Sequence, residues 1–99
     1  MSSEVTVRIP TILRTYTGGA AEVSVDPTSV DGGPVLAGVI NALDADHPGI
    51  KARILDDGGA LRRFVNIYVG DEDVRFAGGL ETPTPGGSQI SVIPAVAGG

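Results

Sequence analysis

A single amphipathic stripe limits what this chain can fold into more than any other stretch of its sequence. The stripe consists of Val35, Leu36, Val39, Ile40 and Leu43. At about 3.6 residues per turn, this spacing places all of them on one side of a helix. The turn sequence at residues 31–34 predicts the helix start, with proline at the first helical position, and residues 44–49 predict its end. We expect the apolar face of this helix to lie across a sheet.

Two alternating stretches precede the helix. Residues 5–9 alternate between aliphatic and polar side chains, which is the pattern of a strand with one buried face. Residues 22–26 alternate in the same way after the turn signal Gly18-Gly19, so we predict an antiparallel hairpin. We expect three side chains to pack the link between its strands: Ile12, Leu13 and Tyr16.

The segments after the helix supply the rest of the sheet. Residues 50–55 suggest a short helical turn. Residues 64–69 are rich in aromatic and β-branched side chains and predict a strand. We place Val65, Ile67 and Val69 on its inner face, with Phe64 and Tyr68 facing outward. An acidic turn at residues 70–73 then leads to a predicted short strand at residues 74–76.

The predicted last strand covers residues 89–93. Burying Ile90 and Val92 in this strand leaves Ile93 exposed. The order of elements is therefore hairpin, helix, strand, short strand and final strand, which predicts an α+β fold with a mixed sheet packed on one main helix. This order is that of the β-grasp, or ubiquitin-like, roll, in which the first and last strands lie side by side in the sheet centre.

Charge and composition argue against several classes of function. The net charge of −5 disfavours nucleic-acid binding, which depends on clustered Lys and Arg. Without cysteine the chain has no disulfide and no thiol nucleophile. One histidine, His47, cannot form a metal site alone, and the acidic run at residues 71–73 lacks the spacing of an EF-hand loop. With no long apolar run and no signal-like start, we expect a cytoplasmic protein that binds no metal, cofactor or membrane.

The sequence ends in Ala95, Val96, Ala97, Gly98 and Gly99. We expect residues 1–94 to form the β-grasp domain and residues 95–99 to form a flexible tail. Two glycines leave a terminal carboxylate without neighbouring side chains, which suits a narrow active site. Five extended residues reach about 17 Å. The tail therefore has the length and shape of a substrate that is presented to another enzyme.

Three segments resemble the MoaD/ThiS family of ubiquitin-like sulfur carriers, and within it the CysO type. They are residues 7–19, residues 63–80 and residues 94–99, and the resemblance covers nearly the whole chain. Gly70 stands where the family pattern has Asn, and residues 83–88 replace its usual acidic turn. These departures lie in predicted loops and leave the tail intact.

The resemblance implies that the chain is a protein co-substrate and that Gly98 and Gly99 carry the chemistry. An E1-like enzyme would adenylate Gly99 with ATP and magnesium, and a sulfurtransferase or sulfide donor would convert the adenylate to a thiocarboxylate. The sulfur would then serve cysteine biosynthesis or another sulfur-containing metabolite. Ala95, Val96 and Ala97 would pass through the partner's channel, while Ile93, Phe64 and Tyr68 would form a docking surface.

The resemblance also implies two further partners, a pyridoxal-phosphate cysteine synthase or another sulfur-accepting synthase, and a zinc peptidase of the JAMM type. ATP-Mg, pyridoxal phosphate and zinc would all belong to these enzymes. Three alternatives stay open from the sequence. They are a ubiquitin-like protein modifier that conjugates to lysines, the small subunit of molybdopterin synthase, and a β-grasp interaction domain whose tail has no role.

Overall fold

The computed structural model describes residues 3–29, 33–63 and 65–94. Five strands form one mixed sheet, β1 (Val5–Arg8), β2 (Glu22–Val25), β3 (Val65–Val69), β4 (Glu72–Asp73) and β5 (Gln89–Pro94), in the order β2-β1-β5-β3-β4. β1 and β5 pair in parallel, and the other neighbours are antiparallel. The predicted position of the last strand beside the first, in the sheet centre, is confirmed.

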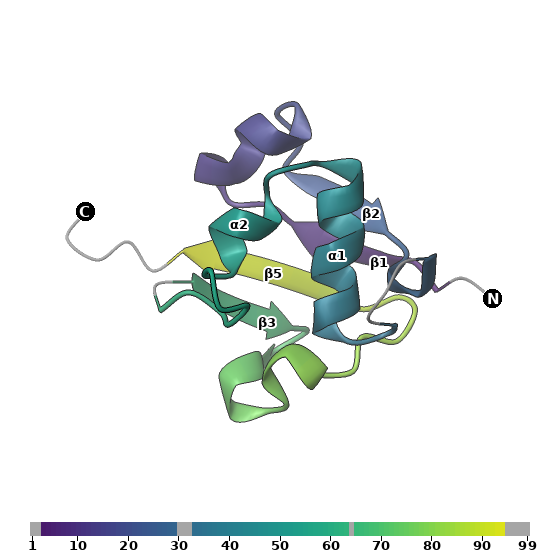
Figure 1. Ribbon diagram of the computed structural model, residues 1–99. Helices are drawn as coiled ribbons and strands as arrows, with labels where there is room; N and C mark the ends of the chain where they lie inside the picture. The colour runs from purple at the N-terminus through teal and green to yellow at the C-terminus, as the bar shows by residue number, and fades with distance from the viewer. Residues whose placement is uncertain (1–2, 30–32, 64, 95–99) are drawn as a thin grey trace.

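The helices α1 (Leu36–Asp46) and α2 (Lys51–Ile54) lie on the same face of the sheet (Figure 1). Short 3-10 turns connect the other elements: η1 (Thr11–Thr17), η2 (Pro27–Ser29), η3 (Val74–Phe76) and η4 (Gly79–Glu81). Between α1 and α2, the Asp44 carboxylate accepts hydrogen bonds from the backbone N–H groups of Gly49 and Lys51 at 3.0 and 3.1 Å. This side chain closes the link between the two helices. Within the described ranges, no helix combines the length and apolar character of a membrane span.

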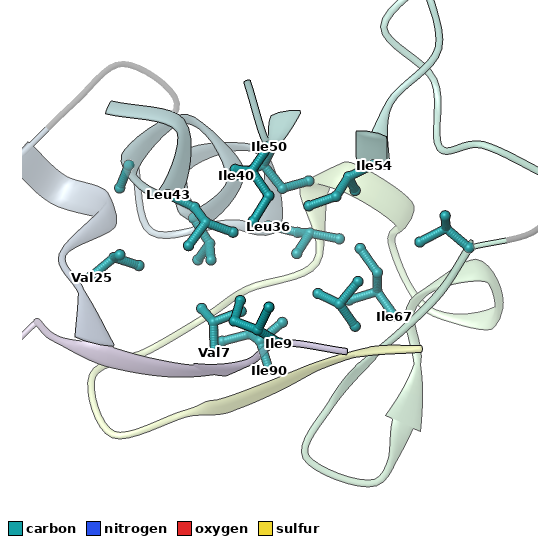
Figure 2. Close-up of a cluster of buried hydrophobic side chains, with 14 of the residues drawn as sticks. Val7, Ile9, Val25, Leu36, Ile40, Leu43, Ile50, Ile54, Ile67 and Ile90 are labelled. Carbon is teal, nitrogen blue, oxygen red and sulfur yellow. The ribbon is translucent and has the colours of Figure 1, made fainter. Parts of the chain in front are cut away.

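The core lies between these helices and the sheet (Figure 2). From α1 it receives Leu36, Val39, Ile40 and Leu43, as the stripe predicts. The sheet contributes alternate residues such as Val7, Ile67 and Ile90, all nearly inaccessible to solvent. Ile50 and Ile54 are also completely buried, so the second helical turn is a full part of the core.

The structure corrects the start predicted for the main helix. Val35 is extended, with φ −130° and ψ 172°, and it forms a β-bridge with Pro83. Leu36 donates its N–H to the Thr82 carbonyl, and Thr84 donates its N–H to the Pro34 carbonyl. This pairing with a distant loop keeps Pro34 outside the helix, and α1 begins at Leu36.

A second correction concerns the short strand predicted at residues 74–76. The strand is β4, formed by two of the acidic residues, and residues 74–76 are the 3-10 turn η3. The Asp73 carboxylate accepts the Arg75 N–H at 2.9 Å and caps this turn. The Arg75 guanidinium donates to the Asn66 side chain and to the Arg62 carbonyl. These bonds fold the segment back on the start of β3, so that it cannot continue the sheet.

Candidate functional site

The described residues include the base of the predicted tail but not the tail itself. Ala95, Val96, Ala97, Gly98 and Gly99 lie outside them, as does Phe64 of the predicted docking surface, so their roles stay predictions. Ile93 of β5 and Tyr68 of β3 are described.

The base of the tail is held by the central strand of the sheet. β5 pairs with β3 as far as the last described residue, with Pro94 opposite Val65 and Ile93 opposite Asn66. On its other side, pairing with β1 ends earlier, at Arg8 opposite Ser91. β5 therefore holds residue 94 in place, and the chain continues from this point towards Gly98 and Gly99.

Ile93 and Tyr68 point to the sheet face opposite the helices. Tyr68 lies across from Ser91, two residues before Ile93, so Tyr68 and Ile93 are diagonal neighbours on that face. Ile93 is 46% exposed, as predicted from the alternation of β5, and Tyr68 is half-buried. The structure thus brings these two predicted docking residues onto one surface.

A groove opens where β1 ends before β5 does. Pro10 directs the chain away from the sheet into η1, so the last residues of β5 run past the end of β1 with η1 beside them. The groove has a volume of about 490 Å³. It is lined by Arg8, Ile9, Pro10, Thr11, Ile12, Arg14 and residues 91–94. Ile9 and Val92 are buried at its base, whereas Ile12 and Ile93 are exposed.

The wall formed by η1 is fixed to the rest of the fold. Leu13 is buried, and the Thr17 hydroxyl donates to the Ala20 carbonyl at 2.9 Å. Arg53 of α2 donates its Nε–H to the Tyr16 hydroxyl at 2.8 Å, and this hydrogen bond raises the pKa of the guanidinium above its ordinary value. This hydrogen bond links η1 to α2.

Ile12 of η1 does not lie where the sequence predicts it. Leu13 and Tyr16 pack the link as expected, but Ile12 is 64% exposed and lines the groove. The groove lining also includes Arg8, Pro10 and Arg14, for which the sequence predicts no role. All three residues lie within residues 7–19, one of the segments that carry the family resemblance. Only the fold shows that they adjoin the end of β5.

No metal centre is found in the part of the chain that the structure describes. There, no three His, Asp or Glu residues gather closely enough to hold an ion. His47 follows the end of α1, as expected, and is partly exposed.

The sheet order, the parallel central pair and the single main helix together define a ubiquitin-like β-grasp protein. The chain belongs to the ThiS family, whose model matches residues 7–99. Both the fold class and the family predicted from the sequence are thereby confirmed.

Individual relatives agree with this placement. The chain is similar to the sulfur carrier protein CysO of Mycobacterium tuberculosis, with 52% identity over 97 residues that cover 96% of this chain and 98% of the relative. The crystal structure of that CysO matches with a TM-score of 0.83, at 50% identity, over 93% of this chain and 99% of its own. A chain in the crystal structure of the Amycolatopsis orientalis BexX/CysO complex matches with a TM-score of 0.84, at 47% identity. The match covers 96% of this protein and 99% of that chain.

A more distant relative carries a different description. Small archaeal modifier protein 1 of Haloferax volcanii is 31% identical over 81 residues, which cover 82% of this chain and 85% of the relative.

Proposed function

We propose that this protein is a sulfur carrier and that the Gly99 carboxylate is the group that is charged with sulfur. The observation that carries the proposal is the family match, which continues through Gly98 and Gly99, together with 52% identity to CysO over nearly the whole chain. The fold supports it, because β5 holds the chain firmly up to Pro94, five residues before Gly99.

Activation precedes sulfur transfer in this proposal. A carboxylate is a stabilised anion whose oxygen is a poor leaving group, so sulfide cannot displace it directly. In the first step a Gly99 carboxylate oxygen attacks the α-phosphorus of ATP, and pyrophosphate leaves. In the second step sulfide attacks the carbonyl carbon, and the bond from that carbon to the oxygen of AMP breaks. The net result replaces one oxygen of Gly99 with one sulfur.

The contribution of this chain is to deliver a tethered sulfur atom. An attached thiocarboxylate is positioned by the docked domain, which gives it the advantage of an intramolecular reactant over free sulfide. The absence of Cβ atoms at Gly98 and Gly99 lets the end enter a narrow catalytic channel. Ala95, Val96 and Ala97 would occupy that channel, with Ile93, Phe64 and Tyr68 contacting its rim. The chain acts as a co-substrate, and its partners supply the catalytic groups.

We propose partners of four kinds, all cytoplasmic: an E1-like adenylating enzyme, a sulfide donor or sulfurtransferase, a sulfur-accepting synthase and a JAMM-type metallopeptidase. Cysteine biosynthesis is the proposed destination of the sulfur, with a pyridoxal-phosphate synthase as acceptor. The similarity to CysO supports this choice. One relative has been crystallised as a BexX/CysO complex, which supports a carrier that acts in complex with a partner protein.

The decisive experiment is an intact-mass measurement. The protein is incubated with ATP-Mg, sulfide and the E1-like adenylating enzyme of its source organism. We expect the mass difference that corresponds to one sulfur replacing one oxygen, and we expect no change when ATP or the enzyme is omitted. A variant that lacks Gly98 and Gly99 is the control and should keep its original mass. An unchanged wild-type mass, or sulfur incorporation into the truncated variant, would contradict the proposal.

A second candidate function is that of a protein modifier, which the similarity to small archaeal modifier protein 1 favours. A modifier would use the same adenylate, but a lysine amine would attack it in place of sulfide. Immunoblots of cell lysates separate the two functions. A modifier gives a ladder of conjugates of higher mass, whereas a carrier gives only the free protein.

A further inference from the structure

The groove between η1 and the end of β5 has surface features that the fold does not require. Ile12 is 64% exposed and Ile93 is 46% exposed, although both are large aliphatic residues. They line one groove whose base is made of buried side chains. Exposed apolar residues that gather in one hollow are typical of a binding surface.

The groove lies close to the surface of any enzyme that binds Gly99 in its active site. Pro94 lines the groove, and the five residues that follow it span at most about 17 Å when extended. An enzyme whose active site encloses Gly99 therefore has its surface within that distance of Pro94. The groove falls inside the area that such an enzyme would contact.

The charge of the groove is opposite to that of the whole protein. The chain has a net charge of −5, with 12 acidic and 7 basic residues. Two of these basic residues, Arg8 and Arg14, line the groove, and none of its described lining residues is acidic. A local basic site on an acidic protein selects for an acidic partner segment.

Both arginines are placed so that their charge is available to a partner. Arg14 donates its Nε–H to the Ile9 carbonyl at 3.1 Å, which fixes the direction of its guanidinium group. Arg8 is paired with Glu22, but the closest N–O distance is 3.8 Å and the two side chains are 62% and 54% exposed. A pair so open to solvent is weak and is easily exchanged for a better carboxylate partner.

We propose that this groove binds a segment of the adenylating enzyme in which an apolar side chain is flanked by acidic residues. The apolar side chain would insert between Ile12 and Ile93, and the carboxylates would pair with Arg8 and Arg14. This inference rests on the proposed function, because it takes the adenylating enzyme as the partner. It adds a docking site on η1 and the end of β1 to the sheet face that carries Ile93 and Tyr68.

The test is the steady-state kinetics of pyrophosphate release by the adenylating enzyme, with the carrier as the varied substrate. We compare wild type with Arg8→Gln, Arg14→Gln and Ile12→Asp. We expect Ile12→Asp to raise KM about tenfold or more, because it brings a carboxylate against acidic residues, and each arginine variant to raise KM several-fold. The kcat should change little, because the segment from Pro94 to Gly99 is unaltered.

Two matched controls test whether the effect belongs to the groove. Lys51→Gln removes one positive charge outside the groove, and Phe76→Ala removes an aromatic side chain that is 89% exposed on η3. Both should keep the wild-type KM. Raising the salt concentration should increase the KM of wild type more than that of Arg8→Gln or Arg14→Gln. Thermal denaturation of each variant identifies any loss of folding.

The possible outcomes separate this inference from the proposed function. If wild type releases no pyrophosphate, the sulfur-carrier proposal itself fails. The docking proposal alone is overturned if wild type is active and the folded groove variants keep its KM. It is also overturned if the control variants raise KM as much as the groove variants do. It is also overturned if sedimentation shows that wild type is a dimer which Ile12→Asp dissociates, since the groove would then hold a second copy of the chain.

Discussion

The side chains missing from Gly98 and Gly99 are as important to the proposed chemistry as any side chain that is present. An active site that closes around a bare peptide can place catalytic groups close to the carbonyl carbon. A Cβ beside that carbon would force the groups apart. A displacement of about 1 Å in a reacting group can lower a rate about a hundredfold.

We therefore predict that Gly99→Ala lowers kcat/KM for adenylation about a hundredfold while leaving the unfolding temperature unchanged. The change would be measured by pyrophosphate release, with thermal denaturation in parallel. Equal activity of Gly99→Ala and wild type would show that the activating enzyme does not have a tight glycine channel.

Lys51 has a separate importance, because it is the only lysine in the sequence. Its Nζ donates to the Asn41 side chain at 2.7 Å. An activated Gly99 can acylate an amine. If copies of this protein are joined to one another through a lysine, that lysine must be Lys51. The carrier and modifier functions therefore make different predictions for one residue.

For Lys51→Arg we predict full sulfur loading, because arginine keeps the positive charge and a donor for Asn41. Incubation with ATP and the adenylating enzyme without sulfide should give no lysine-linked dimer in this variant. Peptide mapping by mass spectrometry identifies the linkage in wild type. Loss of sulfur loading in Lys51→Arg would mean that Lys51 takes part in activation or docking.

Among the elements, α1 depends on a close approach that its stripe does not reveal. Gly38 is buried within the helix, and a Cβ at this position would clash with the Gly33 carbonyl oxygen. That oxygen belongs to the backbone segment that also pairs with residues 82–84. It cannot move aside without disturbing this pairing, so the helix needs glycine here for space.

Gly38→Ala should destabilise the protein by about 1–3 kcal/mol, as overpacking does. Helix propensity alone predicts the opposite, a gain of about 1 kcal/mol. Chemical denaturation of Gly38→Ala and wild type shows whether the free energy of unfolding falls or rises. Ala45→Gly, at an exposed position of the same helix, is the control and should lose about 1 kcal/mol from propensity. A Gly38→Ala variant more stable than wild type would contradict the proposed packing.

Across the whole molecule, the buried aliphatic side chains that the structure describes form one hydrophobic core, while other aliphatic side chains stay at the surface. Ile54 and Ile12 illustrate this division, because they are the same residue type in different surroundings. Ile54 of α2 is completely buried between the helices and the sheet (Figure 2), whereas Ile12 is 64% exposed.

Ile54→Ala should therefore lower the free energy of unfolding by about 2–5 kcal/mol, through lost burial and the cavity that is left. Ile12→Ala should change it by about 0.5 kcal/mol or less. Urea titrations of both variants, fitted with a common m-value, provide the comparison. Similar losses in the two variants would show that η1 is part of the core in solution.

The buried faces of the main helix and strands, and the order in which these elements occur, can be predicted from the sequence alone. Periodicity reports burial directly, since a helix or strand must turn its apolar side chains away from water. The stripe of α1, the inward residues of β3 and the exposed position of Ile93 were all predicted for this reason. The family resemblance, including the closing glycines, is also read from the sequence alone.

Features that depend on contacts between distant segments could not be predicted in this way. Val35 is extended because it pairs with Pro83, and residues 74–76 form a turn because Arg75 reaches back to residues 62–66. The exposure of Ile12 follows from Pro10 directing η1 along the end of β5. Local periodicity contains no information about such partners, because their hydrogen bonds and surfaces exist only after the chain has folded.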